Sequence, residues 1–239
     1  MATSLPPAAP AKVSVWEDVV DIFTSPVEVF VRRIGGDVWI PMGILVLFSA
    51  VFYFATKGLM QPIFDTEFAR GAARAMAKNP QITAEQMEQG RAMMQKVGGV
   101  FVIIGVPISI AFVGIILWLV GKLFGATESV GDAMVIATYA WFPRIISMIV
   151  SAVIAVMVDP SKLNSMFSVT LSAGKFLDPD TTGHAMFLMA GRLDVFILWQ
   201  TALLGLGLSV MGKISRANGF IAAAIMWVVG SGMILAFQR

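Results

Sequence analysis

Two ionisable residues, Arg144 and Asp194, lie deep inside long apolar stretches of the sequence. Charges inside a membrane segment are costly, so each is a first place to look for function. Arg144 lies about 14 residues, or roughly 21 Å of helix rise, from one end of its segment, and Asp194 lies about 12 Å into the next segment. A long arginine side chain nearly closes the remaining gap of about 9 Å. We therefore expect an intramembrane ion pair between Arg144 and Asp194.

This ion pair has two interpretations. In a substrate or proton relay, both charges line a path through the protein, whereas in a structural lock they only fix the register of neighbouring helices. A relay needs further titratable groups at depth, and the segments contain no second deep carboxylate or histidine. We therefore favour the structural lock. Arg192 lies about one or two turns from the expected membrane interface, and its side chain is expected to reach toward that interface.

Other residue types that carry chemistry are scarce. The chain has no cysteine, which excludes disulfides and thiolate metal sites, and its 16 methionines are scattered like apolar filler. Asp178, Asp180 and His184 share one loop, where turn geometry explains them better than a calcium site. The sequence also lacks a phosphate-binding glycine loop, a zinc-protease helix and a nucleophile elbow. We therefore expect no catalytic residue, no metal and no cofactor.

The composition identifies the elements that must position these residues. Of the 239 residues, 57% are hydrophobic and only 13% are charged, whereas soluble domains carry about 25% charged residues. The net charge of +2 does not favour a nucleic-acid partner. A membrane-spanning helix needs about 20 mostly apolar residues. We therefore predict an all-α, polytopic transmembrane helix bundle whose five spans lie at about 39–60, 98–120, 133–158, 186–211 and 220–237.

The chain divides into three parts. Residues 1–12 are rich in proline and alanine and are expected to be a disordered tail. Residues 13–36 are predicted to form short amphipathic helices on the membrane surface, and residues 37–239 form the membrane domain.

Two capping boxes are expected to start these short helices, one at Ser14 with Glu17 and one at Ser25 with Glu28. Their apolar side is predicted to contact the membrane surface, and packing against the protein's own loops remains an alternative. The predicted contact residues are Trp16, Val19, Val20, Phe23 and Phe30.

The connecting segments also carry patterns. Thr83 with Gln86 is expected to cap a helix that runs on into the second span. In the loop over residues 159–185, apolar residues alternate with serine and threonine, which predicts a short strand or hairpin that turns at Gly174. The small residues around Gly205 favour close packing of helices within the chain over dimerisation.

An ordered set of aromatic, proline-containing and glycine-containing segments runs along the chain. These segments are Phe23-Thr-Ser-Pro-Val-Glu-Val-Phe30, Trp39-Ile-Pro41, Tyr139-Ala-Trp-Phe-Pro143-Arg144, Leu193-Asp-Val-Phe-Ile-Leu-Trp199-Gln200, Gly205-Leu-Gly207 and Lys213-Ile-Ser215. The set resembles the bacterial members of the Yip-domain (Ypt-interacting protein-like) family over about residues 16–237. The acidic and Gly-Tyr signatures of the eukaryotic members are not evident, so binding to small GTPases is not carried over.

The resemblance implies a five-span protein of the bacterial inner membrane with a cytoplasmic N-terminus and an external C-terminus. A count of the cations beside the spans leans weakly toward the opposite orientation, and we follow the resemblance. It also implies a non-enzymatic scaffold or accessory subunit that organises membranes or membrane complexes. The expected partners are the lipid bilayer and other membrane proteins, export machinery among them, or a second copy of the chain. The alternative is a small transporter or channel that uses Arg144 and Asp194 within the bundle.

Overall fold

The computed structural model describes residues 14–237, which form helices and connecting loops without any named strand. The α-helices are α1 (Val15–Thr24), α2 (Pro26–Arg32), α3 (Trp39–Thr56), α4 (Gln61–Lys78), α5 (Ala84–Leu123), α6 (Val130–Ala140), α7 (Pro143–Met157), α8 (His184–Arg192), α9 (Val195–Met211) and α10 (Arg216–Phe237). Three short 3-10 helices lie between α7 and α8: η1 (Pro160–Lys162), η2 (Met166–Val169) and η3 (Ala173–Phe176).

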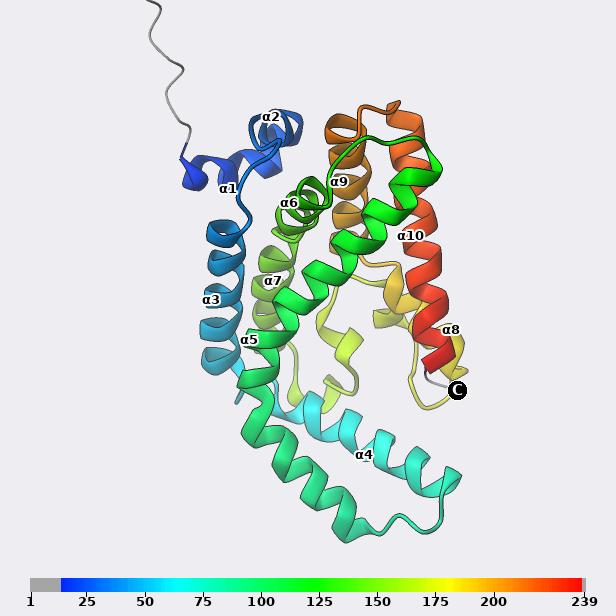
Figure 1. The fold of residues 1–239 in the computed structure, drawn as a ribbon. Coiled ribbons are helices and arrows are strands. Elements are labelled where there is room, and N and C mark those ends of the chain that lie inside the picture. Colours follow the sequence, from blue (N-terminus) through cyan, green and yellow to red (C-terminus); the bar gives the residue numbers. More distant parts are fainter. Residues whose placement is uncertain (1–13, 238–239) are drawn as a thin grey trace, which may run out of the picture.

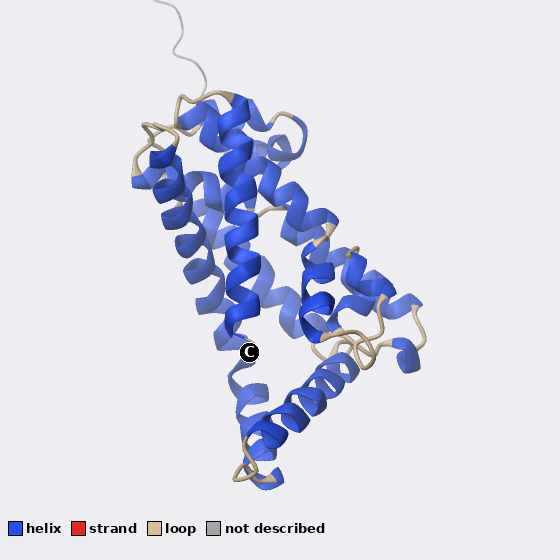
Figure 2. Ribbon diagram, turned by 90° about the vertical axis from the view of Figure 1, so that its right-hand side faces the viewer, coloured by secondary structure: helices blue, strands red, loops and turns tan. Residues whose placement is uncertain are grey.

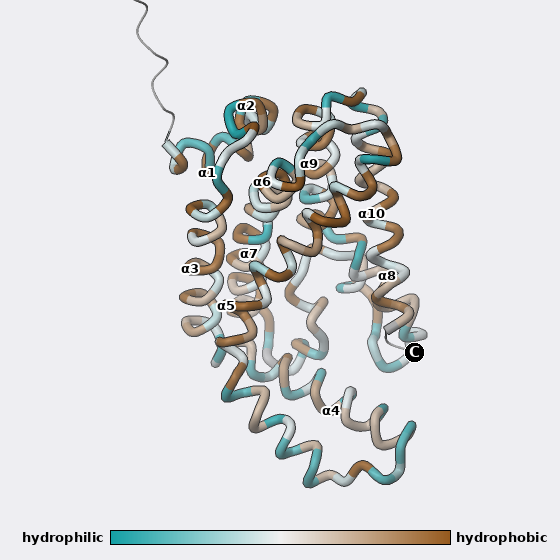
Figure 3. Tube along the Cα trace, in the orientation of Figure 1, coloured by the Kyte–Doolittle hydropathy of each residue, from teal (hydrophilic) through white to brown (hydrophobic). Residues whose placement is uncertain are grey.

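The long helices form a membrane-spanning bundle (Figure 1). In the described part of the chain, α3, α5, the α6–α7 segment Val130–Met157 and α10 make four helices long and apolar enough to cross a bilayer. Helix α9 is also apolar but has only 17 residues. Large apolar side chains on these helices face outward, such as Leu47 and Val228, and brown stretches recur along α3, the upper half of α5 and α10 (Figure 3). The prediction of an all-α transmembrane bundle is therefore confirmed.

Helix α5 is much longer than the second span predicted at 98–120. It contains 40 residues and begins at the capping box of Thr83 and Gln86, as the sequence predicted. Its first half pairs with α4 to form a hairpin that extends away from the bundle (Figure 1), and the perpendicular view shows the same extension (Figure 2). An ion pair between Arg91 Nη2 and Asp65 Oδ1, at 2.5 Å, joins the two helices of this hairpin.

Two of the predicted spans are interrupted. The α6–α7 segment turns at Trp141 and Phe142, directly before Pro143. The span predicted at 186–211 is not one helix, because Leu193 and Asp194 separate α8 from α9. Asp194 has an extended backbone, and its side chain accepts the N–H groups of Phe196 and Ile197. A carboxylate that caps a helix in this way starts a new helix instead of continuing the old one.

The strand or hairpin predicted in the loop over residues 159–185 does not form in the described chain. The loop folds into η1, η2 and η3, and its only extended pairing is an isolated bridge between Ser172 and Asp194. Ala173 N–H donates to the carbonyl of Leu193 at 3.1 Å, and Val195 N–H donates to that of Leu171 at 3.3 Å. The alternating segment therefore pairs with the interruption between α8 and α9, because backbone groups exposed at that break need partners.

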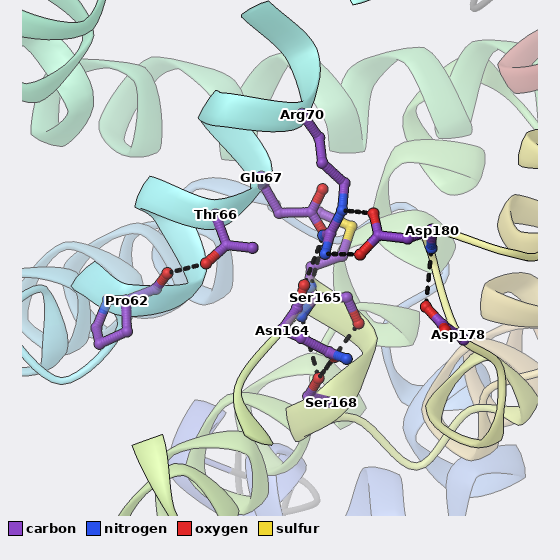
Figure 4. A network of polar contacts seen from close by, with 10 residues as sticks. Pro62, Thr66, Glu67, Arg70, Asn164, Ser165, Ser168, Asp178 and Asp180 are labelled. Atoms are coloured by element: carbon purple, nitrogen blue, oxygen red, sulfur yellow. Dashed lines mark hydrogen bonds and ion pairs between the residues drawn. The ribbon is translucent and has the colours of Figure 1, made fainter. Parts of the chain in front are cut away.

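An arginine of α4 holds the same loop (Figure 4). Arg70 donates from Nε and Nη2 to the two carboxylate oxygens of Asp180, at 2.6 and 3.1 Å, and from Nη1 to the carbonyl of Asn164. Glu67 accepts the N–H of Met166 at 2.9 Å. The hydrogen bond from Arg70 lowers the pKa of Asp180 below its usual value.

Replacement of Arg70 by alanine is expected to release this loop. Hydrogen–deuterium exchange over residues 160–182 should become roughly fivefold faster, because two loop anchors are lost together. The pKa of Asp180 is lowered in the folded protein, so the Arg70–Asp180 ion pair stabilises the fold fully above the ordinary carboxylate pKa. This stabilisation is lost as the pH falls through the pKa that Asp180 has in the folded protein. Arg74→Ala, at an exposed position one turn further along α4, is the matched control. Equal exchange in the two variants would show that Arg70 does not hold the loop.

The N-terminal helices dock on the end of the bundle rather than lying on the membrane alone. Phe30 is fully buried in the core, and Phe23 packs edge-to-face on Trp199 with ring centroids 5.6 Å apart. Val19 is half-buried against the same core. The predicted membrane contact is therefore wrong for the fully buried Phe30, because α2 packs on α9, whereas for the half-buried Val19 and Phe23 it stays a prediction. Only Trp16 and Val20 of the predicted set are exposed, and their membrane contact stays a prediction.

A buried carboxylate fixes these helices in place. Asp18 is fully buried and accepts hydrogen bonds from Arg32 Nε and Nη2, at 3.1 and 2.7 Å, from Arg33 Nε, and from the hydroxyl of Tyr139 at 3.1 Å. Tyr139 belongs to α6, so the network joins α1 and α2 to the membrane bundle. The predicted capping box at Ser14 is confirmed, whereas the side chain of Ser25 makes no cap hydrogen bond at the start of α2.

Glycines allow α9 and α10 to approach closely. A Cβ atom built on Gly219 would lie 2.4 Å from the carbonyl oxygen of Gly205, so the two backbones are almost in contact there. Gly207 faces Ile136 and Phe30 in the same core. Small residues permit such contact between membrane helices, and the expected role of Gly205 and Gly207 in packing within the chain agrees with this geometry.

Candidate functional site

A cavity of about 390 Å³ lies between α5, α9 and α10, where the two interrupted spans meet. Its walls are mainly apolar, and its polar lining consists of Ser109, Arg144, Arg192, Gln200 and Thr201. Interrupted membrane helices commonly form the walls of ligand sites, because a break releases side chains and backbone groups from regular packing. We therefore take this cavity as the candidate functional site.

Arg144 lies in the wall of the cavity at the start of α7. Its Nε donates to Gln200 Oε1 at 3.0 Å, and its guanidinium carbon lies 5.8 Å from the ring centroid of Trp141. The ion pairs of the described residues do not include Arg144 with Asp194. The predicted direct pair is therefore not formed. Asp194 Oδ1 caps α9, and Gln200, about one and a half turns further along α9, is the hydrogen-bond partner of Arg144.

Asp194 is not one of the residues that line the cavity. Its Oδ1 accepts the N–H groups of Phe196 at 2.9 Å and Ile197 at 3.2 Å. Its Oδ2 is buried and has no hydrogen-bond partner among residues 14–237. The carboxylate thus serves the start of α9, and it attracts Arg144 electrostatically without forming an ion pair with it.

Arg192 occupies the other side of the cavity, at the end of α8. Its Nε donates to the hydroxyl of Ser231 in α10 at 3.1 Å, and its guanidinium lies 5.9 Å from the ring centroid of Trp227. Trp227 Nε1 in turn donates to the carbonyl of Arg192 at 3.3 Å. These contacts direct the side chain toward α10, so the expectation that it reaches out to the membrane interface is not met.

The polar and aromatic partners of these arginines were not predicted from the sequence. Gln200 and Ser231 are both buried inside apolar helices, and a buried polar residue in a membrane segment is a signal that was available. Trp141 and Trp227 carry no such signal in the sequence, because aromatic residues are common in membrane spans. Only the fold brings these two rings beside the arginines.

A second concave surface follows the hairpin of α4 and α5. One cavity of about 560 Å³ lies between the end of α3 and the base of the hairpin, and another of about 360 Å³ lies between the two hairpin helices. Phe64 and Met94 line both, so the cavities form one groove, which we call the hairpin groove. Its other apolar lining residues are Tyr53, Met60, Phe68, Ala72, Met87 and Phe101.

A buried acid lies in the connection between α5 and α6. The carboxylate oxygens of Glu128 have no hydrogen-bond partner within the described chain, and Lys122 Nζ lies 3.8 Å from Oε2. Lys122 instead donates to the carbonyls of Ala126 and Glu128, at 2.9 and 2.8 Å. Burial raises the pKa of Glu128 above its usual value, because the lost hydration of the carboxylate outweighs the opposing attraction of Lys122.

Replacement of Glu128 by glutamine is expected to raise the free energy of unfolding at neutral pH by about 1 kcal/mol, since a poorly compensated buried charge is removed. Because the folded pKa is raised, protonation stabilises the wild-type fold as the pH falls through that value. The advantage of the variant should therefore fade at mildly acidic pH. Thermal unfolding in detergent at both pH values measures this, with the exposed Glu28→Gln as control. A stability gain that is independent of pH would contradict the assignment.

Comparison with known proteins identifies a protein family that matches this chain. The model of the Yip1 domain family matches residues 20–237. "Membrane protein YknW" of Bacillus subtilis (strain 168) is 26% identical over 158 residues, which cover 66% of this chain and 63% of that protein. The match therefore spans less than two thirds of the relative's length. No solved structure matches the chain.

Proposed function

Because the chain belongs to the Yip1 domain family and is a multi-pass membrane protein, we propose that it acts without enzymatic chemistry as a scaffold or accessory subunit of a membrane complex. We place it in the bacterial inner membrane with five spans, α9 being one of them, and with a cytoplasmic N-terminus. Its partner is another membrane protein, of the kind found in export machinery.

The hairpin groove is the observation that carries this proposal. It combines aromatic and methionine side chains on two helices that extend beyond the bundle (Figure 1). Flexible methionine side chains adapt to different apolar surfaces, and an amphipathic helix commonly lays its apolar face in such a groove. The occupant we propose is therefore an amphipathic helix of the partner protein.

The test is purification of the tagged full chain from native membranes in mild detergent. A stoichiometric partner is expected with the wild type and should be lost in Met94→Glu, which places a charge in the groove. Met93→Glu is the matched control, because Met93 is the adjacent exposed residue but does not line the groove. A monodisperse protein without a partner, or equal partner recovery from both variants, would reject the proposal.

A second candidate function is a small transporter or channel. The observation that favours it is the cavity at the two helix interruptions, with Arg144 in its wall. Anion flux into reconstituted vesicles that is abolished by Arg144→Gln, while the variant keeps its folded helix content, would replace the scaffold by the transporter.

A further inference from the structure

The cavity between α5, α9 and α10 holds two arginines, neither of which has a carboxylate of the described chain at ion-pair distance. No aspartate or glutamate lines it among the described residues, and neither Arg144 nor Arg192 forms an ion pair there. Asp194 Oδ1 accepts backbone N–H groups of α9, and the carboxylate attracts Arg144 only from beyond ion-pair distance. Arginine stays protonated even in apolar surroundings, and two guanidinium groups beside the single, more distant charge of Asp194 leave a net positive site that favours an anion from outside the chain.

The two guanidinium groups are held in the same way. Each uses Nε for one neutral partner, Gln200 for Arg144 and Ser231 for Arg192, and each lies near a tryptophan ring. Their terminal Nη atoms have no hydrogen-bond partner within residues 14–237. These atoms are not completely buried either, so a ligand can reach them. Four N–H-bearing nitrogens are therefore positioned and open to a ligand, and arginine binds phosphate through such paired donors.

The mouth of the cavity is apolar. Phe112 of α5 and Val229 of α10 line the cavity and are 49% and 46% exposed, on helices whose outer faces are apolar. A ligand that enters between these helices passes from the hydrocarbon region of the bilayer. It must combine an anionic head with an apolar tail.

We propose that this cavity binds an anionic phospholipid, with its phosphate between Arg144 and Arg192 and its acyl chains leaving between α5 and α10. Basic pockets between membrane helices suit such head groups. A zwitterionic phospholipid fits less well, because its ammonium group would lie beside two guanidinium groups that have no carboxylate at ion-pair distance within the described chain. The site is separate from the hairpin groove, so the proposal does not depend on the scaffold function.

Native mass spectrometry of the full chain in detergent tests the proposal. Phosphatidylglycerol is expected to bind roughly tenfold more tightly than phosphatidylcholine with the same acyl chains. Arg144→Gln/Arg192→Gln should remove this preference. Lys162→Gln/Lys175→Gln, which removes the same charge at exposed positions, should keep it. Equal binding of the two lipids by the wild type would overturn the proposal.

A steric variant keeps the test decisive if the arginine variants do not fold. A Cβ atom on Gly230 meets only Arg192 Nη2, at 3.7 Å, so Gly230→Leu fills the cavity without a backbone clash. It should abolish the lipid preference, whereas Gly232→Leu, at a position with open space outside the cavity, should retain it. Inorganic phosphate is the probe for a free anion. If it displaces phosphatidylglycerol at equal concentration, the site takes free phosphate and the lipid assignment is wrong.

Discussion

Replacement of Asp18 by alanine is expected to lower the free energy of unfolding by about 3 kcal/mol and to detach α1 and α2 from the bundle. The carboxylate is fully buried, and its loss leaves Arg32, Arg33 and the Tyr139 hydroxyl without their shared acceptor. The arginine side chains are 26% and 22% exposed, so water compensates them only in part. Thermal unfolding measures the loss, and trypsin cleavage after Arg32 and Arg33 reports the detachment.

Asp21→Ala provides the control for this prediction. Asp21 accepts from the same Arg32 Nη2 at 2.6 Å but is 32% exposed, so its removal should cost at most about 1 kcal/mol. If Asp18→Ala unfolds like the Asp21 variant and stays protected from trypsin, the buried network does not hold the N-terminal helices.

Replacement of Gly219 by alanine is expected to destabilise the bundle by about 1–3 kcal/mol, although alanine is the better helix former. The added methyl group would lie 2.4 Å from the carbonyl oxygen of Gly205 and 3.0 Å from Cβ of Ser209. The first of these neighbours is backbone, so α9 and α10 must move apart. The readouts are thermal unfolding in detergent and hydrogen–deuterium exchange in both helices.

Gly43→Ala is the matched control, because no atom lies within 4 Å of a Cβ built on Gly43 in α3. Its stability should be unchanged or raised by up to about 1 kcal/mol. The two substitutions are chemically identical, so opposite effects would isolate the contact between α9 and α10. An equal loss of stability in both variants would show that the contact between α9 and α10 is not the cause of the loss.

The amino-acid sequence by itself determined the membrane class and most of the helices. Low charge and long apolar segments require a bilayer, and the capping boxes at Ser14 and Thr83 mark where two helices begin. These features are local, since they depend on composition and on residues within one or two turns. The resemblance to the Yip-domain family likewise came from short ordered segments and agrees with the family match over residues 20–237.

Only the tertiary structure decided the partners of the charged residues. Asp18 binds Tyr139 across 121 positions of sequence, and Arg144 binds Gln200 across 56. The expected direct contact of Arg144 with Asp194 is not formed: Asp194 Oδ1 caps α9, Arg144 donates to Gln200, and the carboxylate acts on Arg144 only from a longer distance. Spacing along a chain gives the depth of a residue in the membrane. The direction in which each helix faces, and therefore which polar groups meet, depends on packing between helices that no single segment encodes.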